Sequence, residues 1–304
     1  MRLRKEAEKL LKLEGVAGIS VREDPAVRVF VERIEPRVLS ELPEEIEGRK
    51  LEIIETGRIS ILLSPEEKQS VVRPLVPGIS VGSELVTAGT IGQICVDEDG
   101  ELAILSNYHV LYGDVGTKVL SPGPYDGGTE VVGYVKEFVP LRKDAFNLVD
   151  CAIASIEKGI EASNCEDELG FPTGMGEARE GDILWKSGRT TCVTSGKVLD
   201  TSATIKVHGY PEGAFCFDDV IVTSCMAYGG DSGSAAFNSA GEIVGLVFAG
   251  SDKITVICKI QHVCRELKIR LITGPSKIAA PKRIRAEVLL PLTFGIGMYT
   301  LSEE

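Results

Sequence analysis

Short apolar runs separated by turn residues occupy the middle of the chain, from Gly78 to about Ile272. The runs are rich in Val, Ile and Thr, and the chain has 33 glycines and 14 prolines to supply the breaks. Such patterning is typical of β-barrels or sandwiches, because amphipathic helical stretches are few. The runs predict strands over 88–96, 102–106, 131–138, 150–156, 181–186, 196–199, 203–207, 220–224, 234–237, 243–249 and 254–260. This number of strands suits two small barrels better than one sheet.

The segment before these runs has a mixed pattern. Apolar residues at helical spacing predict a helix over 3–13, ending at Gly15. Strand-like runs follow at 16–21, 27–34 and 51–63, which together predict a small α/β module. Residues 64–70 are polar and unpatterned, so we expect a linker there. The predicted organisation is a module with the start of its linker over 1–66, a main domain over 67–273 and a tail over 274–304.

The tail contains an apolar stretch over 289–301. Pro291, Gly295 and Gly297 interrupt it, and it is too short to cross a bilayer. We expect it to pack on the body or to form a contact between subunits, and an internal inhibitor that enters a cleft is the alternative. Homo-oligomerisation is therefore among the expectations.

Charge and composition exclude several classes of protein. The formal net charge of −12 argues against a nucleic-acid partner, which needs a cationic face. The N-terminus alternates charges with leucines and so lacks the apolar core of a signal peptide, and we expect a cytoplasmic protein with no membrane partner. The eight cysteines are then expected to stay reduced. No Cys-x-x-Cys pair occurs and the three histidines are scattered, so no metal or cofactor is expected.

Residues 229–234 read Gly-Gly-Asp-Ser-Gly-Ser and set Ser232 among glycines beside Asp231. Glycine tolerates positive φ and lets backbone N–H groups converge, so this stretch can form an oxyanion hole around a nucleophilic serine. A glycine-rich turn is the alternative interpretation. A serine nucleophile also needs a positioned base, which in turn needs a carboxylate to orient it.

The base and the carboxylate can be sought upstream. His109 stands at the end of the apolar run 103–111, and Asp150 lies within the apolar stretch 147–154, where a buried carboxylate requires partners. An N-cap or an ordinary ion pair is the alternative for Asp150. The α/β-hydrolase elbow requires the order Ser, acid, His and a helix after the serine. Here only His262 follows Ser232, and the residues after the serine, 235–237 and 243–247, look like strands, which argues against that class.

Three motifs in the order His, Asp, Ser resemble those of the trypsin-like (chymotrypsin-fold) serine peptidases over about residues 78–272. They are Leu105-Ser106-Asn107-Tyr108-His109-Val110-Leu111, Val149-Asp150-Cys151-Ala152-Ile153-Ala154 and Gly230-Asp231-Ser232-Gly233-Ser234. The module followed by Ala88-Gly89-Thr90 is similar to a poorly characterised bacterial group related to the plant narrow-leaf proteins. The chain departs from the family at Ser234, where a second glycine is usual, and in lacking an export signal.

The resemblance implies a mainly β fold, with a two-barrel chymotrypsin-like domain preceded by a small α/β module. It implies a serine endopeptidase in which Ser232 attacks the peptide carbonyl, His109 transfers the proton and Asp150 orients His109. The backbone N–H groups of Gly230 and Ser232 would then form the oxyanion hole.

The resemblance also assigns supporting and substrate-binding residues. The stretch Lys186-Ser187-Gly188-Arg189-Thr190-Thr191 is similar to a segment of the bacterial secreted branch, so Arg189 is expected to pair with Asp231 and hold the oxyanion loop. Met226 stands where trypsin has the acid of its specificity pocket, which predicts a non-basic, medium-sized apolar P1 residue. Phe248, Ala249 and Gly250 are expected to pair with the substrate backbone. A proteolytically weak or inactive trypsin-like scaffold is the alternative function.

Overall fold

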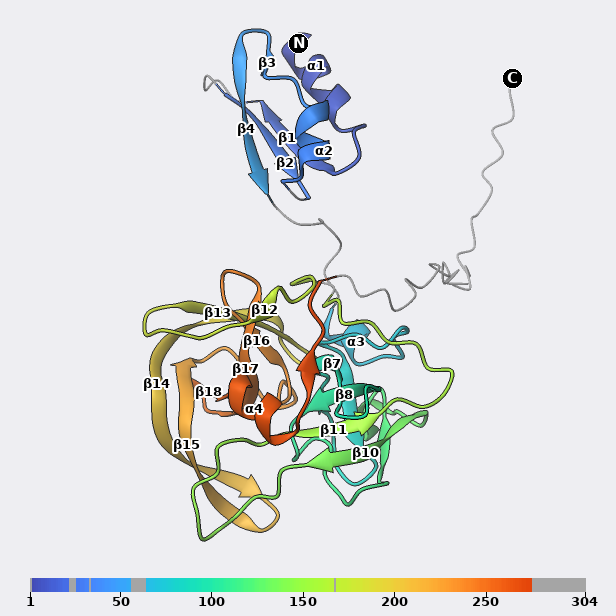
Figure 1. Cartoon of the computed structure of the whole chain (residues 1–304), viewed down its shortest axis with the longest axis vertical. Coiled ribbons are helices and arrows are strands. Elements are labelled where there is room, and N and C mark those ends of the chain that lie inside the picture. The colour runs from blue at the N-terminus through green and yellow to red at the C-terminus, as the bar shows by residue number, and fades with distance from the viewer. Residues whose placement is uncertain (1, 22–25, 33, 56–63, 167, 275–304) are drawn as a thin grey trace, which may run out of the picture.

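The computed structural model describes residues 2–21, 26–32, 34–55, 64–166 and 168–274 (Figure 1). Part of the third predicted run, 56–63, and nearly all of the predicted tail, 275–304, lie outside the described residues. The described part of the chain is mainly β, as the sequence predicts.

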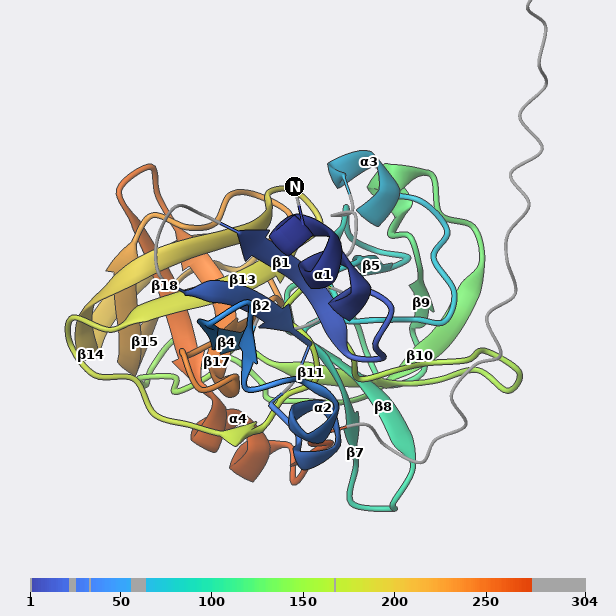
Figure 2. The same ribbon diagram turned by 90° about the horizontal axis from the view of Figure 1, so that it is seen from above.

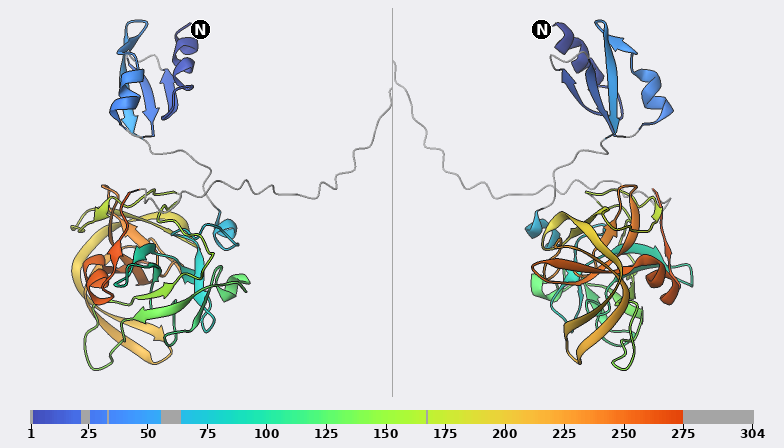
Figure 3. Two further views of the ribbon diagram at one scale, coloured as in Figure 1. Left: turned by 45° about the vertical axis from the view of Figure 1, so that its right-hand side comes forward. Right: turned by 90° about the vertical axis from the view of Figure 1, so that its left-hand side faces the viewer.

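The N-terminal module is a four-stranded sheet with two helices packed on it (Figure 3). Its elements are α1 (Arg2–Leu10), β1 (Val16–Val21), β2 (Val27–Val31), α2 (Pro36–Glu41), β3 (Glu45–Ile46) and β4 (Arg49–Glu55). The strand order is β1-β2-β4-β3, with β2 parallel to β4 and antiparallel to β1. Alternate residues of β2, Val27, Val29 and Val31, are fully buried against Leu10 of α1 and Val38 of α2. The alternation of the sequence therefore produces a sheet with one covered face.

The first large sheet of the body curls into a barrel. Within the described residues it consists of β5 (Ser80–Ser83), β6 (Gly89–Thr90), β7 (Gln93–Val96), β8 (Leu102–Ser106), β9 (Lys118–Leu120), β10 (Val131–Phe138), β11 (Ala152–Ser155) and β19 (Arg270–Leu271). Their order is β19-β7-β8-β11-β10-β9-β5-β6, and the short helix η1 (Pro124–Asp126) follows β9. Only Ile91 and Gly92 separate β6 from β7, so the chain itself brings the two ends of the sheet together.

The second sheet closes completely. It contains β12 (Gly174–Met175), β13 (Ile183–Gly188), β14 (Cys192–Tyr210), β15 (Gly213–Ser224), β16 (Ala235–Phe237), β17 (Glu242–Gly250) and β18 (Ile254–Lys259), and α4 (Ile260–Glu266) follows. Because β18 pairs with both β15 and β17, the strands from β13 to β18 form a closed barrel. The long β14–β15 pair lies on one side of the body and β7 and β8 on the other (Figure 2).

The two barrels share an apolar layer. On β8, Ile104 belongs to the core of the first barrel, whereas Ala103 and Leu105 pack with Phe217, Phe248 and other residues of the second. Both faces of the strand are therefore buried, and this explains why its sequence is a continuous apolar run rather than an alternating one.

Two parts of the body differ from the sequence-based expectation. β14 is one 19-residue strand where two short strands are predicted, because its pairing with β15 continues through register shifts near Asp200 and Ala203. Residues 64–70 are not a simple linker, since α3 (Pro65–Lys68) forms there. Ser64 Oγ accepts a hydrogen bond from Glu67 N at 3.2 Å, and Ser64 N donates to Glu67 Oε2 at 2.6 Å. This reciprocal capping box starts the helix.

Candidate active site

His109 and Asp150 lie close together at the barrel interface. His109 follows β8 and Asp150 precedes β11, and these two strands are antiparallel neighbours, so their ends bring the two residues to the same place. His109 Nδ1 lies 2.6 Å from Asp150 Oδ2. The His109 side chain is 27% exposed while that of Asp150 is fully buried, so the ring keeps one side open to solvent.

The Asp150 carboxylate is fully buried and receives several hydrogen bonds. Oδ1 accepts from the backbone N–H groups of Tyr108 at 2.7 Å and His109 at 3.2 Å. Oδ2 accepts from the Tyr210 hydroxyl at 2.5 Å in addition to its contact with His109. Burial alone would raise the pKa of Asp150, but the His109 ring and the hydrogen bonds from His109 and Tyr210 outweigh it and lower the pKa. The carboxylate is therefore held ionised and in one orientation beside His109.

Ser232 lies on the loop between β15 and β16 and is half-buried. Its carbonyl accepts a hydrogen bond from Thr90 N at 2.8 Å, and Thr90 Oγ1 donates to the carbonyl of Gly230 at 2.8 Å. Gly230 has φ +97°, a conformation that favours glycine. Among the described residues, the N–H groups of Gly230 and Ser232 have no hydrogen-bond acceptor.

Gly89 shows how near the Ser232 loop lies to the His109 segment. A Cβ built on Gly89 would stand 2.4 Å from Val110 Cγ2 and 2.9 Å from the Ser232 carbonyl oxygen. The residue that follows His109 and the backbone of Ser232 therefore flank the same glycine. No hydrogen bond joins the His109 ring to the Ser232 hydroxyl in the described part of the chain. Bonds of this kind are often long in the absence of substrate.

The loop also explains Ser234, which departs from the family motif. Its side chain is fully buried, and its hydroxyl donates to the Asp231 carbonyl at 2.6 Å. A Cβ built on Gly188 would stand 2.7 Å from Ser234 Oγ, so this glycine makes room for the larger side chain. Ser234 thus stabilises the turn around Ser232 by a hydrogen bond.

The predicted ion pair between Arg189 and Asp231 is wrong. Lys186 is the cation beside Asp231, with 3.2 Å between Lys186 Nζ and Asp231 Oδ2 and both side chains fully buried. Arg189 forms its ion pair with Asp126 of η1 instead. Lys186 points inward from β13, while Arg189 lies beyond the end of that strand.

Hydrogen bonds complete the surroundings of the Asp231 carboxylate. It accepts from Thr190 N at 3.0 Å, from Thr191 N at 3.1 Å, from Thr191 Oγ1 at 2.6 Å and from Tyr228 N at 3.0 Å. Burial lowers the pKa of Lys186, and the charge of Asp231 opposes that change. Asp231 therefore joins the loop to the turn at Thr190 and Thr191, and its cation is Lys186 rather than the predicted Arg189.

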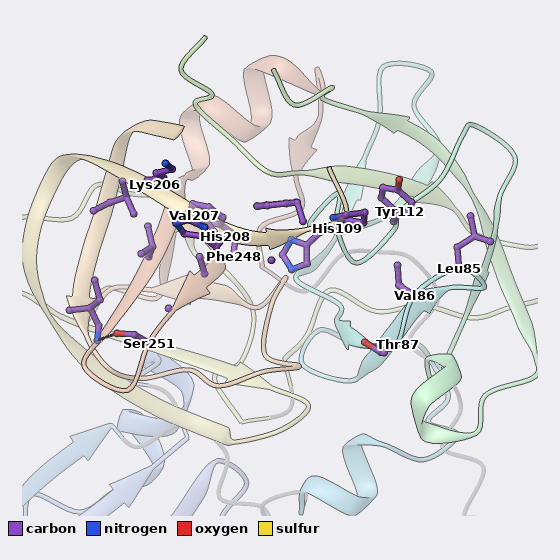
Figure 4. A pocket seen from close by; sticks show the side chains of 18 residues that line it. Leu85, Val86, Thr87, His109, Tyr112, Lys206, Val207, His208, Phe248 and Ser251 are labelled. Carbon is purple, nitrogen blue, oxygen red and sulfur yellow. Dashed lines mark hydrogen bonds between the residues drawn. The ribbon is translucent and has the colours of Figure 1, made fainter. Parts of the chain in front are cut away.

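A cavity of about 760 Å³ opens beside His109 (Figure 4). The His109 ring lies between Val207, His208 and Phe248 on one side and Leu85, Val86 and Tyr112 on the other. The cavity is lined by Leu85, Val86, Thr87, His109, Tyr112, Ile205, Lys206, Val207, His208, Gly209, Tyr210, Pro211, Phe248, Ala249, Gly250, Ser251, Ile254 and Val256. The lining contains no carboxylate.

The predicted substrate-binding residues fall in two places. Phe248, Ala249 and Gly250 line the cavity. Met226 does not line it, because its side chain is only 3% exposed and packs in the core of the second barrel with Val198 and Ile221. The identification of Met226 as a pocket residue rested on sequence position, which does not reveal where a side chain points.

Sequence reasoning missed Lys186 as the cation beside Asp231 and Tyr210 as a hydrogen-bond donor to Asp150. It also missed the buried Lys68, which forms ion pairs with Glu166 and Glu168. Lys186 carried a weak indication, because a charged residue in the otherwise apolar start of β13 requires a buried partner. Tyr210 carried none, since it lies 60 residues from Asp150 and only the pairing of β14 with β15 brings it there.

The described ranges contain neither a cluster of metal-ligating side chains nor a membrane-spanning helix. No group of three or more potential ligand side chains there could hold a metal ion. The helices in the same ranges include none with the length and apolarity needed to span a bilayer.

Comparisons with known proteins agree with this fold. A family model for the trypsin-like peptidase domain matches residues 91–246, just over half of the chain, and that range contains His109, Asp150 and Ser232. Protease A of Thermobifida fusca is 22% identical, with a TM-score of 0.51, over 66% of this chain and 99% of that one. A Nocardiopsis protease is 20% identical, with the same TM-score and the same coverage. The search of curated proteins found no match.

The structural class is therefore the two-barrel fold of the chymotrypsin-like serine proteases. Within it, the chain belongs to the trypsin-like peptidase domain family.

Proposed function

We propose that this protein is a serine endopeptidase with Ser232 as nucleophile, His109 as general base and Asp150 as the residue that orients His109. The observation that carries the proposal is the 2.6 Å contact between His109 Nδ1 and a fully buried, ionised Asp150. That contact fixes the imidazole so that Nε2 is its unprotonated nitrogen, which is the form that accepts a proton from a serine hydroxyl.

The reaction follows from these roles. His109 Nε2 takes the Ser232 proton as Oγ attacks the peptide carbonyl carbon, and Asp150 stabilises the resulting imidazolium. The tetrahedral intermediate collapses when His109 gives the proton to the leaving amine, which leaves an acyl-enzyme on Ser232. Water, deprotonated by His109, then hydrolyses the ester and restores the hydroxyl. The unbonded N–H groups of Gly230 and Ser232 supply donors for the oxyanion.

Substrate would bind as an added strand at β17. On one side β17 pairs with β18 as far as Gly250, whereas on the other its pairing with β16 ends at Leu246. Residues 248–250 therefore keep a strand edge without a strand partner among the described residues, and these residues line the cavity. Main-chain hydrogen bonds at this edge provide affinity, and the side-chain pockets provide specificity. The absence of a carboxylate from the cavity lining favours non-basic, apolar substrate side chains.

A fluorophosphonate probe, which reacts with activated serine hydroxyls, tests the proposal. We expect labelling of the wild-type chain and none of Ser232→Ala, with Ser239→Ala, on an exposed turn, as the matched control. A fluorogenic peptide panel should then favour apolar over Arg or Lys residues at P1. A folded wild type that resists the probe contradicts the proposal and indicates the scaffold alternative, and a preference for Arg or Lys contradicts the specificity.

A further inference from the structure

We propose that Tyr210 is a positioning residue for the His109–Asp150 pair, an inference that rests on the proposed function. The Tyr210 hydroxyl donates to Asp150 Oδ2 at 2.5 Å, and the same oxygen lies 2.6 Å from His109 Nδ1. One carboxylate oxygen therefore holds both the imidazole and the phenol. Hydrogen bonds to a charged acceptor are the stronger kind, and this one forms at a fully buried carboxylate.

Tyr210 reaches this place from the second barrel. It is the last residue of β14, opposite Gly213 of β15, at the tip of the hairpin that projects beside the active site. Asp150 and His109 belong to the first barrel. The hydroxyl bond therefore crosses from one barrel to the other and makes the orientation of Asp150 depend on both.

Aromatic packing fixes the Tyr210 ring. Its centroid lies 5.1 Å from that of Phe215, edge to face, and 5.8 Å from the His109 ring at an interplanar angle of 88°. These edge-to-face geometries are favourable for aromatic pairs. The ring therefore has contacts of its own, and removing only the hydroxyl leaves them in place.

A second contact holds the hairpin tip against the His109 segment. The Tyr112 hydroxyl donates to Glu212 Oε1 at 2.9 Å. Glu212 lies in the two-residue turn that follows Tyr210, and Tyr112 lies three residues after His109. The tip thus contacts the first barrel at both Asp150 and Tyr112, and Tyr210 together with Pro211 forms part of the cavity wall.

The hydroxyl has a definite electrostatic effect. It is one of the hydrogen bonds that lower the pKa of the Asp150 carboxylate. Without it, Asp150 Oδ2 keeps only its contact with His109, so the pKa of Asp150 rises and the Asp150–His109 contact changes. The titratable groups around Asp150 are His109 and Tyr108 after β8, Cys151 next to it in the chain, Tyr210 on β14 and Cys258 on β18. Phenylalanine at position 210 removes only one of these.

The test compares Tyr210→Phe with Tyr134→Phe, an exposed tyrosine of β10 whose ring hydroxyl has no partner among the described residues. We expect Tyr210→Phe to lower kcat about tenfold or more with KM little changed, because the hydroxyl acts through Asp150 rather than on substrate. The acid limb of the kcat/KM profile should shift with the altered Asp150–His109 contact. Tyr134→Phe should match the wild type in kcat, in KM and in the pH dependence of kcat/KM.

A spectroscopic readout separates this inference from the proposed function. The Nδ1–H proton resonance of the His109 ring is compared by NMR in the wild type and in both variants. A shift of this resonance in Tyr210→Phe alone supports the positioning role, with or without turnover. Absence of turnover in the wild type overturns the proposed function. An unchanged Nδ1–H resonance of His109 in a folded Tyr210→Phe chain overturns the role of Tyr210.

Discussion

At the scale of single residues, the ion pair of Lys186 and Asp231 supports the loop that contains Ser232. The two side chains are fully buried, and nothing but the protein can compensate their charges. Asp231 has four further hydrogen-bond donors, all from Tyr228 or from the turn at Thr190 and Thr191. The pair therefore joins the loop that contains Ser232 to the end of β13.

Replacing Lys186 by methionine should destabilise the fold and impair the site. The substitution keeps the length of the side chain but leaves the buried Asp231 carboxylate without a cation, which costs about 3 kcal/mol. We expect a similar loss in the free energy of unfolding, measured by urea titration, and a slower reaction with fluorophosphonate.

The double variant Lys186→Met/Asp231→Asn is the matched control, because it removes both charges. It should regain part of the stability lost in the single variant. A Lys186→Met chain with wild-type stability and labelling rate would show that Asp231 does not depend on Lys186.

At the scale of elements, α3 connects the segment before the first barrel to residues 187–189, next to the loop that contains Ser232. Lys68, at its end, is 1% exposed, and its Nζ lies 2.7 Å from Glu168 Oε2 and 2.5 Å from Ser187 Oγ. Ser187 is the neighbour of Lys186 on β13, and Gln69 Nε2 donates to the Arg189 carbonyl at 3.2 Å. Lys68 and Gln69 therefore hold Ser187 and Arg189, which lie within the stretch 186–191 that contacts Asp231.

Two truncated chains test the role of α3. A chain that starts at Ser64 keeps the helix and its capping box and should match the full chain in labelling rate. A chain that starts at Ser70 lacks Lys68 and leaves the carboxylates of Glu166 and Glu168 without their cation. We expect it to lose about 3 kcal/mol of unfolding free energy and most of its labelling.

The point variant Lys68→Met in the full chain should reproduce the effect of starting the chain at Ser70. If the chains starting at Ser64 and Ser70 behave alike, α3 has no part in maintaining the site.

At the scale of the whole molecule, buried and paired carboxylates link stability to pH. Burial would raise the pKa of Asp97 and of Asp219, but their hydrogen bonds and ion pairs with Lys136 and Lys259 lower it, as His109 and Tyr210 do for Asp150. Glu166 has the opposite shift, because burial raises its pKa more than Lys68 lowers it. Asp97, Asp150 and Asp219 therefore stabilise the folded state only while they are ionised.

The protein should lose stability on acidification. In the unfolded chain these aspartates have ordinary pKa values near about 4, so below about pH 5 the unfolded state binds more protons than the folded one. The free energy of unfolding should then fall as pH decreases through the lowered pKa values, with Glu166 offsetting a part. The single tryptophan, Trp185 on β13, allows urea titrations followed by fluorescence between pH 6 and about pH 3. A constant unfolding free energy over that range would contradict the expectation.

The sequence by itself determined the class of fold and predicted the three residues of the proposed triad. Short apolar runs predict strands because backbone period and burial act over a few residues, and β8 and β10 lie at the predicted bounds. His109, Asp150 and Ser232 were recognisable because each stands in a local motif. Long-range pairings leave no such local pattern, since the partner of a buried charge can lie anywhere along the chain.

Tertiary structure alone decided which cation meets Asp231, which hydroxyl meets Asp150 and where Met226 points. Lys186 rather than Arg189 is the partner of Asp231 because β13 directs Lys186 into the interior. Tyr210 reaches Asp150 because β14 continues to the hairpin tip instead of ending where its polar residues suggest. The geometry of the site depends on such contacts between distant segments, and these exist only once both barrels have closed.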